Sequence, residues 1–276
     1  TKWRSCSRIS IRRPTWRACW PNRCSVCLAD NIYESDRLVR EYLLFHYGEP
    51  DEVLPWKHGP RESLGFAARC VRELLNSSSV GRDARALDVG CAVGRSSFEL
   101  AGHCREVIGI DYSAAFIDAA ERVRRDGEVA YEYTVEGART ARAVARVPAG
   151  VDVARLKFET GDAMTLRPDL GAFDVVLAAN LLCRLPDPRV FLARLPGLVK
   201  SGGQLLLTTP FTWLEEFTPR DKWIGGTGEL ESADELTRLL EPDFELKLSK
   251  ELPFLIREHA RKYQWSVAWG TRWVKK

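Results

Sequence analysis

The chain has no apolar run that approaches the roughly 20 residues of a membrane-spanning helix, and its longest apolar runs have the length of strands. Residues 1–29 also contain no apolar h-region of the kind that marks a secretory signal. These absences exclude a membrane protein and a conventional secreted one. We therefore expect a soluble, cytoplasmic protein that has no membrane partner.

The eight cysteines lack the regular spacing of a disulfide framework. Cys91 and Cys183 lie in apolar contexts, which indicates free thiols in a reducing compartment. Cys24-Ser-Val-Cys27 is a CxxC pair with no second pair nearby. Because a zinc site usually needs four ligands, no metal site is predicted.

Acidic residues are missing from the N-terminus. Of the 41 Lys and Arg residues, seven lie in residues 1–29, which contain no acid, and the other 34 face 38 Asp and Glu residues. A basic end suits nucleic acid. However, the remaining chain is mildly acidic and has neither an Asn/Asp-Pro-Pro-Tyr loop nor a basic, aromatic stripe, so no nucleic-acid partner is expected. We predict a leader over 1–29 and one domain over 30–276, divided into a helical cap (30–80) and a core (84–276).

The core has the alternation of a parallel sheet covered by helices on both faces. Strands are expected at 85–89, 105–111, 155–160, 173–179 and 204–209, with helices at 95–103, 113–125 and 187–199. Further helices are expected at 31–48, 61–75 and 232–240, strands at 244–256 and 261–273, and a surface insertion at 126–154. The last two strands follow one another without a helix, which predicts an antiparallel pair at one edge. The fold class is therefore α/β, a doubly wound, three-layer α/β/α sheet.

The first strand runs into the segment ALDVGCAVGRSSFEL (86–100), which does not fit the common nucleotide loops. Ala92 and Arg95 break the Gly-x-Gly-x-x-Gly pattern of dinucleotide-binding proteins, and no Walker loop is present. The remaining pattern, Asp88-x-Gly90-x-x-x-Gly94, has the shape of the S-adenosylmethionine loop of class I methyltransferases. The glycines allow the backbone to pass close to a ligand, and the acid can meet its ammonium group.

Two further acids end the next two strands along the chain, where they would face the same ligand. Asp111 is placed to bind both ribose hydroxyls, and Asp162 lies where such folds hold the adenine. Asn180 follows the fourth strand and either orients a substrate nitrogen or satisfies local backbone groups. The predicted cofactor-binding residues are Tyr33, Asp88, Gly90, Cys91, Gly94, Asp111, Tyr112, Asp162, Ala163 and Asn180.

Five phrases of the sequence extend this motif: NIYESDRLVREYLLFHYG, GCAVGRSSFEL, NLLCRLPDP, TTPFTWLEEFTPRDKWIGG and LPFLIREHARKYQWSV. Together, from about Asn31 to Val267, they resemble the 4-mercaptohistidine N1-methyltransferase family of ovothiol biosynthesis. In that family the enzyme occurs alone or fused to a sulfoxide synthase. The resemblance implies methyl transfer from S-adenosylmethionine to an imidazole nitrogen of 5-thiohistidine, and a synthase as partner or fused domain.

Such an acceptor is a zwitterion that carries a sulfur, and several residues are candidates to bind it. Tyr33 and Tyr47 are placed to close over the site, and Trp213 and Glu215 lie in the loop after the fifth strand. Regular strand alternation would put Arg257 and His259 on one side, where they suit a carboxylate clamp and a proton acceptor or thiolate partner. The predicted catalytic residues are Asn180 and His259, and the predicted substrate-binding residues are Tyr47, Trp213, Glu215, Arg257 and His259.

Two other functions fit the same sequence. One is methyl transfer to another imidazole, including a histidine side chain within a protein. The other is a binding module that has kept the fold and lost its activity, although Gly90, Gly94, Asp111 and Asp162 argue against it.

Overall fold

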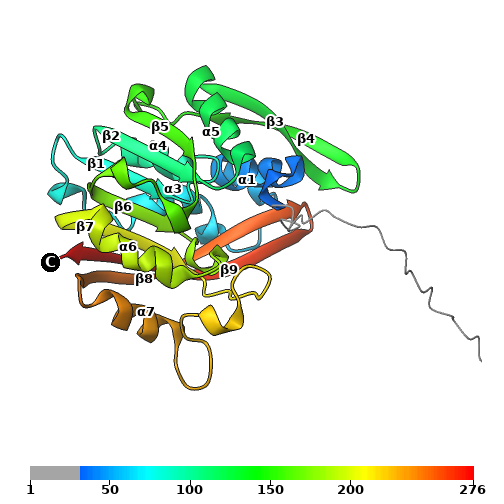
Figure 1. The fold of residues 1–276 in the computed structure, drawn as a ribbon. Helices are drawn as coiled ribbons and strands as arrows, with labels where there is room; N and C mark the ends of the chain where they lie inside the picture. Colours follow the sequence, from blue (N-terminus) through cyan, green and yellow to red (C-terminus); the bar gives the residue numbers. More distant parts are fainter. Residues whose placement is uncertain (1–31) are drawn as a thin grey trace, which may run out of the picture. The chain divides into compact units, whose positions relative to one another are not determined.

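The computed structural model describes residues 32–276, in which strands and helices form three layers (Figure 1). The predicted leader over 1–29 and the Cys24–Cys27 pair lie outside these described residues. The seven strands of the main sheet are β1 (Arg85–Val89), β2 (Glu106–Asp111), β5 (Leu156–Thr160), β6 (Phe173–Ala179), β7 (Val199–Thr209), β8 (Phe244–His259) and β9 (Lys262–Lys275). The described helices are α1 (Asp36–Tyr47), α2 (Pro50–Val53), α3 (Phe66–Arg72), α4 (Arg95–Ala101), α5 (Ala114–Asp126), α6 (Pro188–Leu198) and α7 (Ser232–Leu240).

The strand order is β5-β2-β1-β6-β7-β9-β8. The first five strands of this order are parallel to one another. Strand β9 pairs antiparallel with both β7 and β8. The chain leaves β1 toward β2 and β5, and then returns to β6 on the other side of β1. The predicted doubly wound sheet with an antiparallel edge is therefore confirmed, and its switch point lies between β1 and β6.

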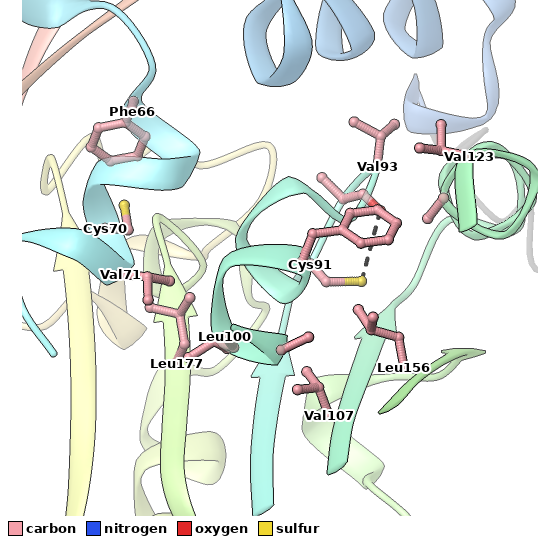
Figure 2. Packing of buried hydrophobic residues seen from close by; sticks show 14 of the residues in the cluster. Phe66, Cys70, Val71, Cys91, Val93, Leu100, Val107, Val123, Leu156 and Leu177 are labelled. Carbon is pink, nitrogen blue, oxygen red and sulfur yellow. Dashed lines mark hydrogen bonds between the residues drawn. The ribbon is translucent and has the colours of Figure 1, made fainter. Parts of the chain in front are cut away.

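The central strands β1, β2, β6 and β7 are largely apolar on both faces because each face packs against a separate layer. Ala86, Val107 and Leu206 enter one apolar cluster with α1, α3, α4 and α5 (Figure 2). Their neighbours in the strands, such as Leu87 and Ile108, enter a second cluster with α6 and α7. The helices before β1 share the first cluster with the sheet. The predicted boundary between a cap at 30–80 and a core at 84–276 stays a prediction.

Most expected elements agree with the structure to within a few residues, and local backbone groups explain the shifts. Ser35 caps α1 by accepting a hydrogen bond from the Leu38 N–H, so this helix begins at Asp36. Gly65 has a φ of +66° and separates a short 3₁₀ turn at Arg61–Ser63 from α3. The helix expected over 61–75 is therefore shorter than predicted.

The expectation of a surface insertion at 126–154 was wrong in one respect. This segment forms a hairpin of its own, β3 (Glu128–Glu136) with β4 (Arg139–Arg146). One face of the hairpin is buried through Tyr131, Ala143 and Ala145, which join the first apolar cluster. The insertion is therefore part of the core on one side.

At Ala260 the tip of the β8–β9 hairpin is hydrogen-bonded to the β3–β4 hairpin. The Ala260 N–H donates to the Val135 carbonyl over 3.0 Å. Its carbonyl accepts from Trp56 Nε1 at 2.7 Å and from the Tyr263 hydroxyl at 2.9 Å. Helix α1 contacts β3, β4 and β8, so it packs against both the β3–β4 and the β8–β9 hairpin (Figure 1).

None of the helices within residues 32–276 is long and apolar enough to cross a membrane.

Candidate functional site at the carboxyl edge of the sheet

The loop after β1 is held in place by its neighbours. Gly90 and Gly94 have φ values of +77° and +87°, which only glycine adopts without strain. A Cβ at Gly94 would lie 2.7 Å from Phe158 Cζ, so this residue also allows the loop to pack on β5. Cys91 and Val93 are fully buried in the apolar cluster, as Figure 2 shows. The Cys91 side chain is thus turned into the core, and the backbone is the part of this residue that is left for a ligand.

Asp88 lies beneath this loop with none of its surface exposed. The hydroxyls of Ser96 and Ser97 donate to its Oδ2 at 2.7 and 2.6 Å, while Oδ1 has no partner within the described chain. Burial is the main cause that raises the pKa of this carboxyl to about 6; the hydrogen bonds from Ser97 and Ser96 oppose the rise, and the charge of Asp111 adds to it. A buried acceptor without a donor fits an ammonium group or a water that bridges to one.

Asp111 connects the loop to the next helix. Its Oδ2 accepts from the Ala92 N–H at 2.8 Å and its Oδ1 from the Ser113 N–H at 2.9 Å. Burial raises its pKa, although these backbone donors oppose the rise. Since a carboxylate has about four acceptor positions, both oxygens can still accept from vicinal hydroxyls.

The other predicted cofactor residues have mixed surroundings. Asp162 caps a 3₁₀ turn by accepting from the Met164 N–H at 2.8 Å, and Ala163 behind it is buried. Tyr112 is 59% exposed beside Asp111 and has room to lie over a ligand. These placements are compatible with an adenine site and do not test it.

Asn180 follows β6 in the left-handed conformation, with a φ of +53°. Its N–H donates to the Thr208 carbonyl at 2.8 Å and to the Thr208 hydroxyl oxygen at 3.1 Å. The same hydroxyl donates to Asn180 Oδ1 at 2.9 Å. Thr208, a buried residue of β7, was missed because it lies within an apolar strand.

Backbone strain marks the same edge. Within residues 32–276, the residues other than glycine with positive φ are Ala92, Asn180 and Phe211. They follow β1, β6 and β7, which are neighbours in the sheet. Such conformations cost about 1–3 kcal/mol each and gather at functional sites, so this edge is the candidate site.

A cover of aromatic side chains crosses this edge. The Ser113 hydroxyl donates to the Tyr33 carbonyl at 3.0 Å, which fixes Tyr33 beside the end of β2. The Tyr33 ring lies 5.7 Å from Phe116 and 6.4 Å from Phe217, which follows β7. The Tyr33 ring therefore contacts both α5 and the loop that follows β7, and its role in covering the cofactor stays a prediction.

Tyr47, which was predicted to bind substrate, instead supports the loop. Its hydroxyl donates to the Val93 carbonyl at 2.7 Å, and burial raises its pKa well above the ordinary value. Trp213 is held through Nε1, which donates to the Ser232 hydroxyl at 3.0 Å. Glu215 is exposed in the same loop as Trp213, where it remains available to a ligand.

The structure does not support the predicted pairing of Arg257 with His259. The register shifts between them, so regular alternation does not continue through this part of β8. Arg257 is 4% exposed, donates to the Glu52 carbonyl and lies 5.0 Å from the Tyr133 ring. His259 Nδ1 accepts from the Arg261 N–H at 3.3 Å. Within residues 32–276, these contacts of Arg257 and His259 include no residue of the carboxyl edge.

Two cavities lie near the β8–β9 arm, away from the loop after β1. One of about 270 Å³ has Arg257, Tyr133 and the outer side of α1 in its walls. The other, of about 630 Å³, is lined by Trp56, Tyr263 and their neighbours. Neither includes a predicted cofactor residue. In residues 32–276 no group of three or more His, Cys, Asp or Glu side chains could hold a metal.

Part of this chain is similar to known methyltransferases. Residues 87–207 match the family model described as a methyltransferase domain. The trans-aconitate 2-methyltransferase of Methylobacterium radiotolerans is 31% identical over 63% of this chain and 59% of its own length. The tRNA U34 carboxymethyltransferase of Actinobacillus succinogenes is 25% identical over 65% of this chain and 52% of its own. The chain thus spans between half and three fifths of these relatives.

Among solved structures, an S-adenosylmethionine-dependent methyltransferase of Methanosarcina mazei matches 72% of this chain and 95% of its own, with a TM-score of 0.50 and 20% identity. The fold is that of the class I methyltransferases, and residues 87–207 are similar to a methyltransferase domain. The unpartnered Oδ1 of Asp88 and the remaining acceptor positions of Asp111 fit that cofactor.

Proposed function

We propose that this chain transfers the methyl group of S-adenosylmethionine to an imidazole ring nitrogen of 5-thiohistidine, the last step of ovothiol A biosynthesis. The observation that carries methyl transfer is the buried, unpartnered oxygen of Asp88 beside the strained loop after β1. The resemblance of five segments between Asn31 and Val267 supports the choice of acceptor. The aromatic cover over the edge supports a small, enclosed substrate.

When bound, the cofactor supplies a methyl group on a positively charged sulfur. Asp88 and Asp111 hold its ammonium and ribose groups, and Tyr33 covers it. Tyr47 keeps the loop in position by its hydrogen bond to Val93. By excluding water around a charge that disperses during transfer, this cover favours the reaction.

Asn180 orients the acceptor in this proposal. The hydroxyl of Thr208 fixes which way the side-chain amide faces, because it donates to Oδ1. Oδ1 has a second lone pair, which accepts the N–H of the imidazole ring. The other ring nitrogen then presents its lone pair to the methyl group. A neutral imidazole needs no base before it attacks, so positioning supplies most of the rate.

The test is an assay of the purified chain with labelled S-adenosylmethionine. It offers 5-thiohistidine, histidine, a histidine-containing peptide and trans-aconitate, the acceptor in the name of one relative, and NMR locates the methylated atom. Label on a ring nitrogen of 5-thiohistidine supports the proposal. Label only on the peptide or only on trans-aconitate would make that molecule the acceptor in place of 5-thiohistidine. Tight cofactor binding without label on any of them contradicts it.

Three variants separate the predicted roles. We expect Asn180→Ala to lose transfer while it keeps its affinity for S-adenosylhomocysteine. Glu215→Ala tests whether that exposed carboxylate holds the ammonium group of the acceptor. His259→Ala tests the catalytic role predicted from sequence, and a fully active variant would remove His259 from the site.

A further inference from the structure

Arg184 places a positive charge beside the candidate site. It ends the 3₁₀ turn Leu182–Arg184, four residues after Asn180 at the carboxyl end of β6. Its Nη1 donates to the Cys183 carbonyl at 3.1 Å and to the Thr212 carbonyl at 3.4 Å. Its guanidinium carbon lies 4.7 Å above the centre of the Phe217 ring. The side chain is thus fixed between the turn after β6 and the loop after β7.

The charge of Arg184 has no carboxylate partner among the ion pairs of residues 32–276. Its half-buried guanidinium reaches Tyr33, whose ring also contacts Phe217. Burial raises the pKa of Tyr33, and the positive charge of Arg184 opposes that rise. Arg184 thus lies beside Tyr33 at the carboxyl end of β6, in the turn that follows Asn180.

We propose that Arg184 binds the carboxylate of the methyl acceptor and thereby selects acidic acceptors. This rests on the proposed function, because it concerns the substrate of that same site. With Nη1 occupied by carbonyls, the donors on Nε and Nη2 are left for Tyr33 and for a ligand. A guanidinium fixed by stacking on Phe217 matches the planar pair of carboxylate oxygens.

Arg184 would supply the cation for the acceptor carboxylate that Arg257 does not supply. An amino-acid acceptor needs a cation for its carboxylate, and the predicted one, Arg257, is held by Glu52 and Tyr133. Arg184 is nearer to Asn180 in the chain and is fixed by the loops that follow β6 and β7. The carboxylate would thus anchor the acceptor at the same strand end as the residue that orients its ring.

The experiment uses matched ligands with and without a carboxylate. The full chain is saturated with S-adenosylhomocysteine, and calorimetry measures its affinity for 5-thiohistidine and for 5-thiohistamine, which lacks the carboxylate. We expect Arg184→Met to weaken 5-thiohistidine about tenfold or more and to leave 5-thiohistamine within about twofold. Arg184→Lys keeps the charge without the fork and should recover part of the loss. Arg220→Met is the matched control, since Arg220 also lies over a ring, that of Trp223.

Two outcomes overturn the proposal: equal weakening of both ligands in Arg184→Met, or no preference of the wild type for 5-thiohistidine over 5-thiohistamine. Labelled methyl transfer on the same ligands separates it from the proposed function. If 5-thiohistidine is not methylated but its carboxylate-dependent binding is lost in Arg184→Met, the acceptor fails and the role of Arg184 stands. If Arg184→Met methylates 5-thiohistidine and 5-thiohistamine as well as the wild type does, the proposed acceptor stands and the role of Arg184 fails.

Discussion

The hydroxyl of Thr208 donates to Asn180 Oδ1 over 2.9 Å and also accepts from the Asn180 N–H at 3.1 Å. One buried side chain on β7 therefore fixes both the backbone and the side chain at the end of β6. Because Asn180 holds a left-handed backbone, this pair of bonds stabilises a conformation that is otherwise unfavourable.

Thr208→Val, which keeps the shape and removes the hydroxyl, should impair catalysis more than cofactor binding. We expect kcat for methyl transfer to fall about tenfold to a hundredfold because Asn180 is no longer oriented. The dissociation constant of S-adenosylhomocysteine should change little. Thr208→Ser is the control, since it keeps the hydroxyl. An unchanged kcat in the valine variant would show that Asn180 does not need this partner.

Asp88 should make the protein less stable as the pH rises from about 4 to about 6. Burial raises its pKa from 3.8 to about 6, so in this range the folded state binds more protons than the unfolded state. The free energy of unfolding then falls with increasing pH, by at most about 3 kcal/mol. Urea unfolding of wild type and Asp88→Asn across pH 4–7 measures the difference. The same slope in both proteins would assign it to other groups.

Cofactor affinity should follow the opposite trend. An ionised Asp88 attracts an ammonium group, and the carboxyl ionises near pH 6. We therefore expect S-adenosylhomocysteine to bind more tightly as the pH rises from 5 to 7. Calorimetric titration of Asp88→Asn should show a weaker dependence on pH. An identical dependence in the two proteins would place the ammonium group elsewhere.

Gly94→Ala should be more destabilising than an alanine at another left-handed glycine. At Gly94 the new Cβ would lie 2.7 Å from Phe158 Cζ, in addition to the strain of a φ of +87°. We expect a loss of about 2–4 kcal/mol in unfolding free energy. Gly137→Ala meets nothing within 4 Å and should cost only about 1 kcal/mol. Equal losses of unfolding free energy in the two variants would show that the contact with Phe158 adds no cost. Adding Phe158→Leu to Gly94→Ala should then recover no unfolding free energy.

Tyr47→Phe should weaken the cofactor and spare the acceptor. The variant removes the hydrogen bond to the Val93 carbonyl, which supports the loop after β1. We expect S-adenosylhomocysteine to bind about threefold to tenfold more weakly, with little change in the KM of the acceptor. A rise in the acceptor KM alone would restore the substrate-binding role predicted from the sequence.

Much of the fold follows from the sequence because β1, β2 and β6 are buried on both faces and are largely apolar. The loop around Asp88 and Gly94 could also be predicted from the sequence, since its left-handed backbone restricts which residues fit. These features depend on local geometry, which a sequence records directly.

The features that were missed depend on contacts between distant segments. The β3–β4 hairpin is rich in Ala and Arg, and only its packing makes Tyr131 and Ala145 a buried face. Thr208 and Arg184 lie within stretches that read as apolar packing. The shift between Arg257 and His259 depends on the register with β9, which alternation in one strand does not reveal.

The junction at Ala260 has a consequence for how the molecule moves. Its backbone joins the tip of β8–β9 to Val135 of the other hairpin and to Trp56, and α1 runs between these segments. These parts, encoded by separate stretches of the chain, should unfold as one cooperative unit. The amides of α1 should then exchange with solvent as slowly as those of the sheet, and access to the site should depend on the loops after β6 and β7.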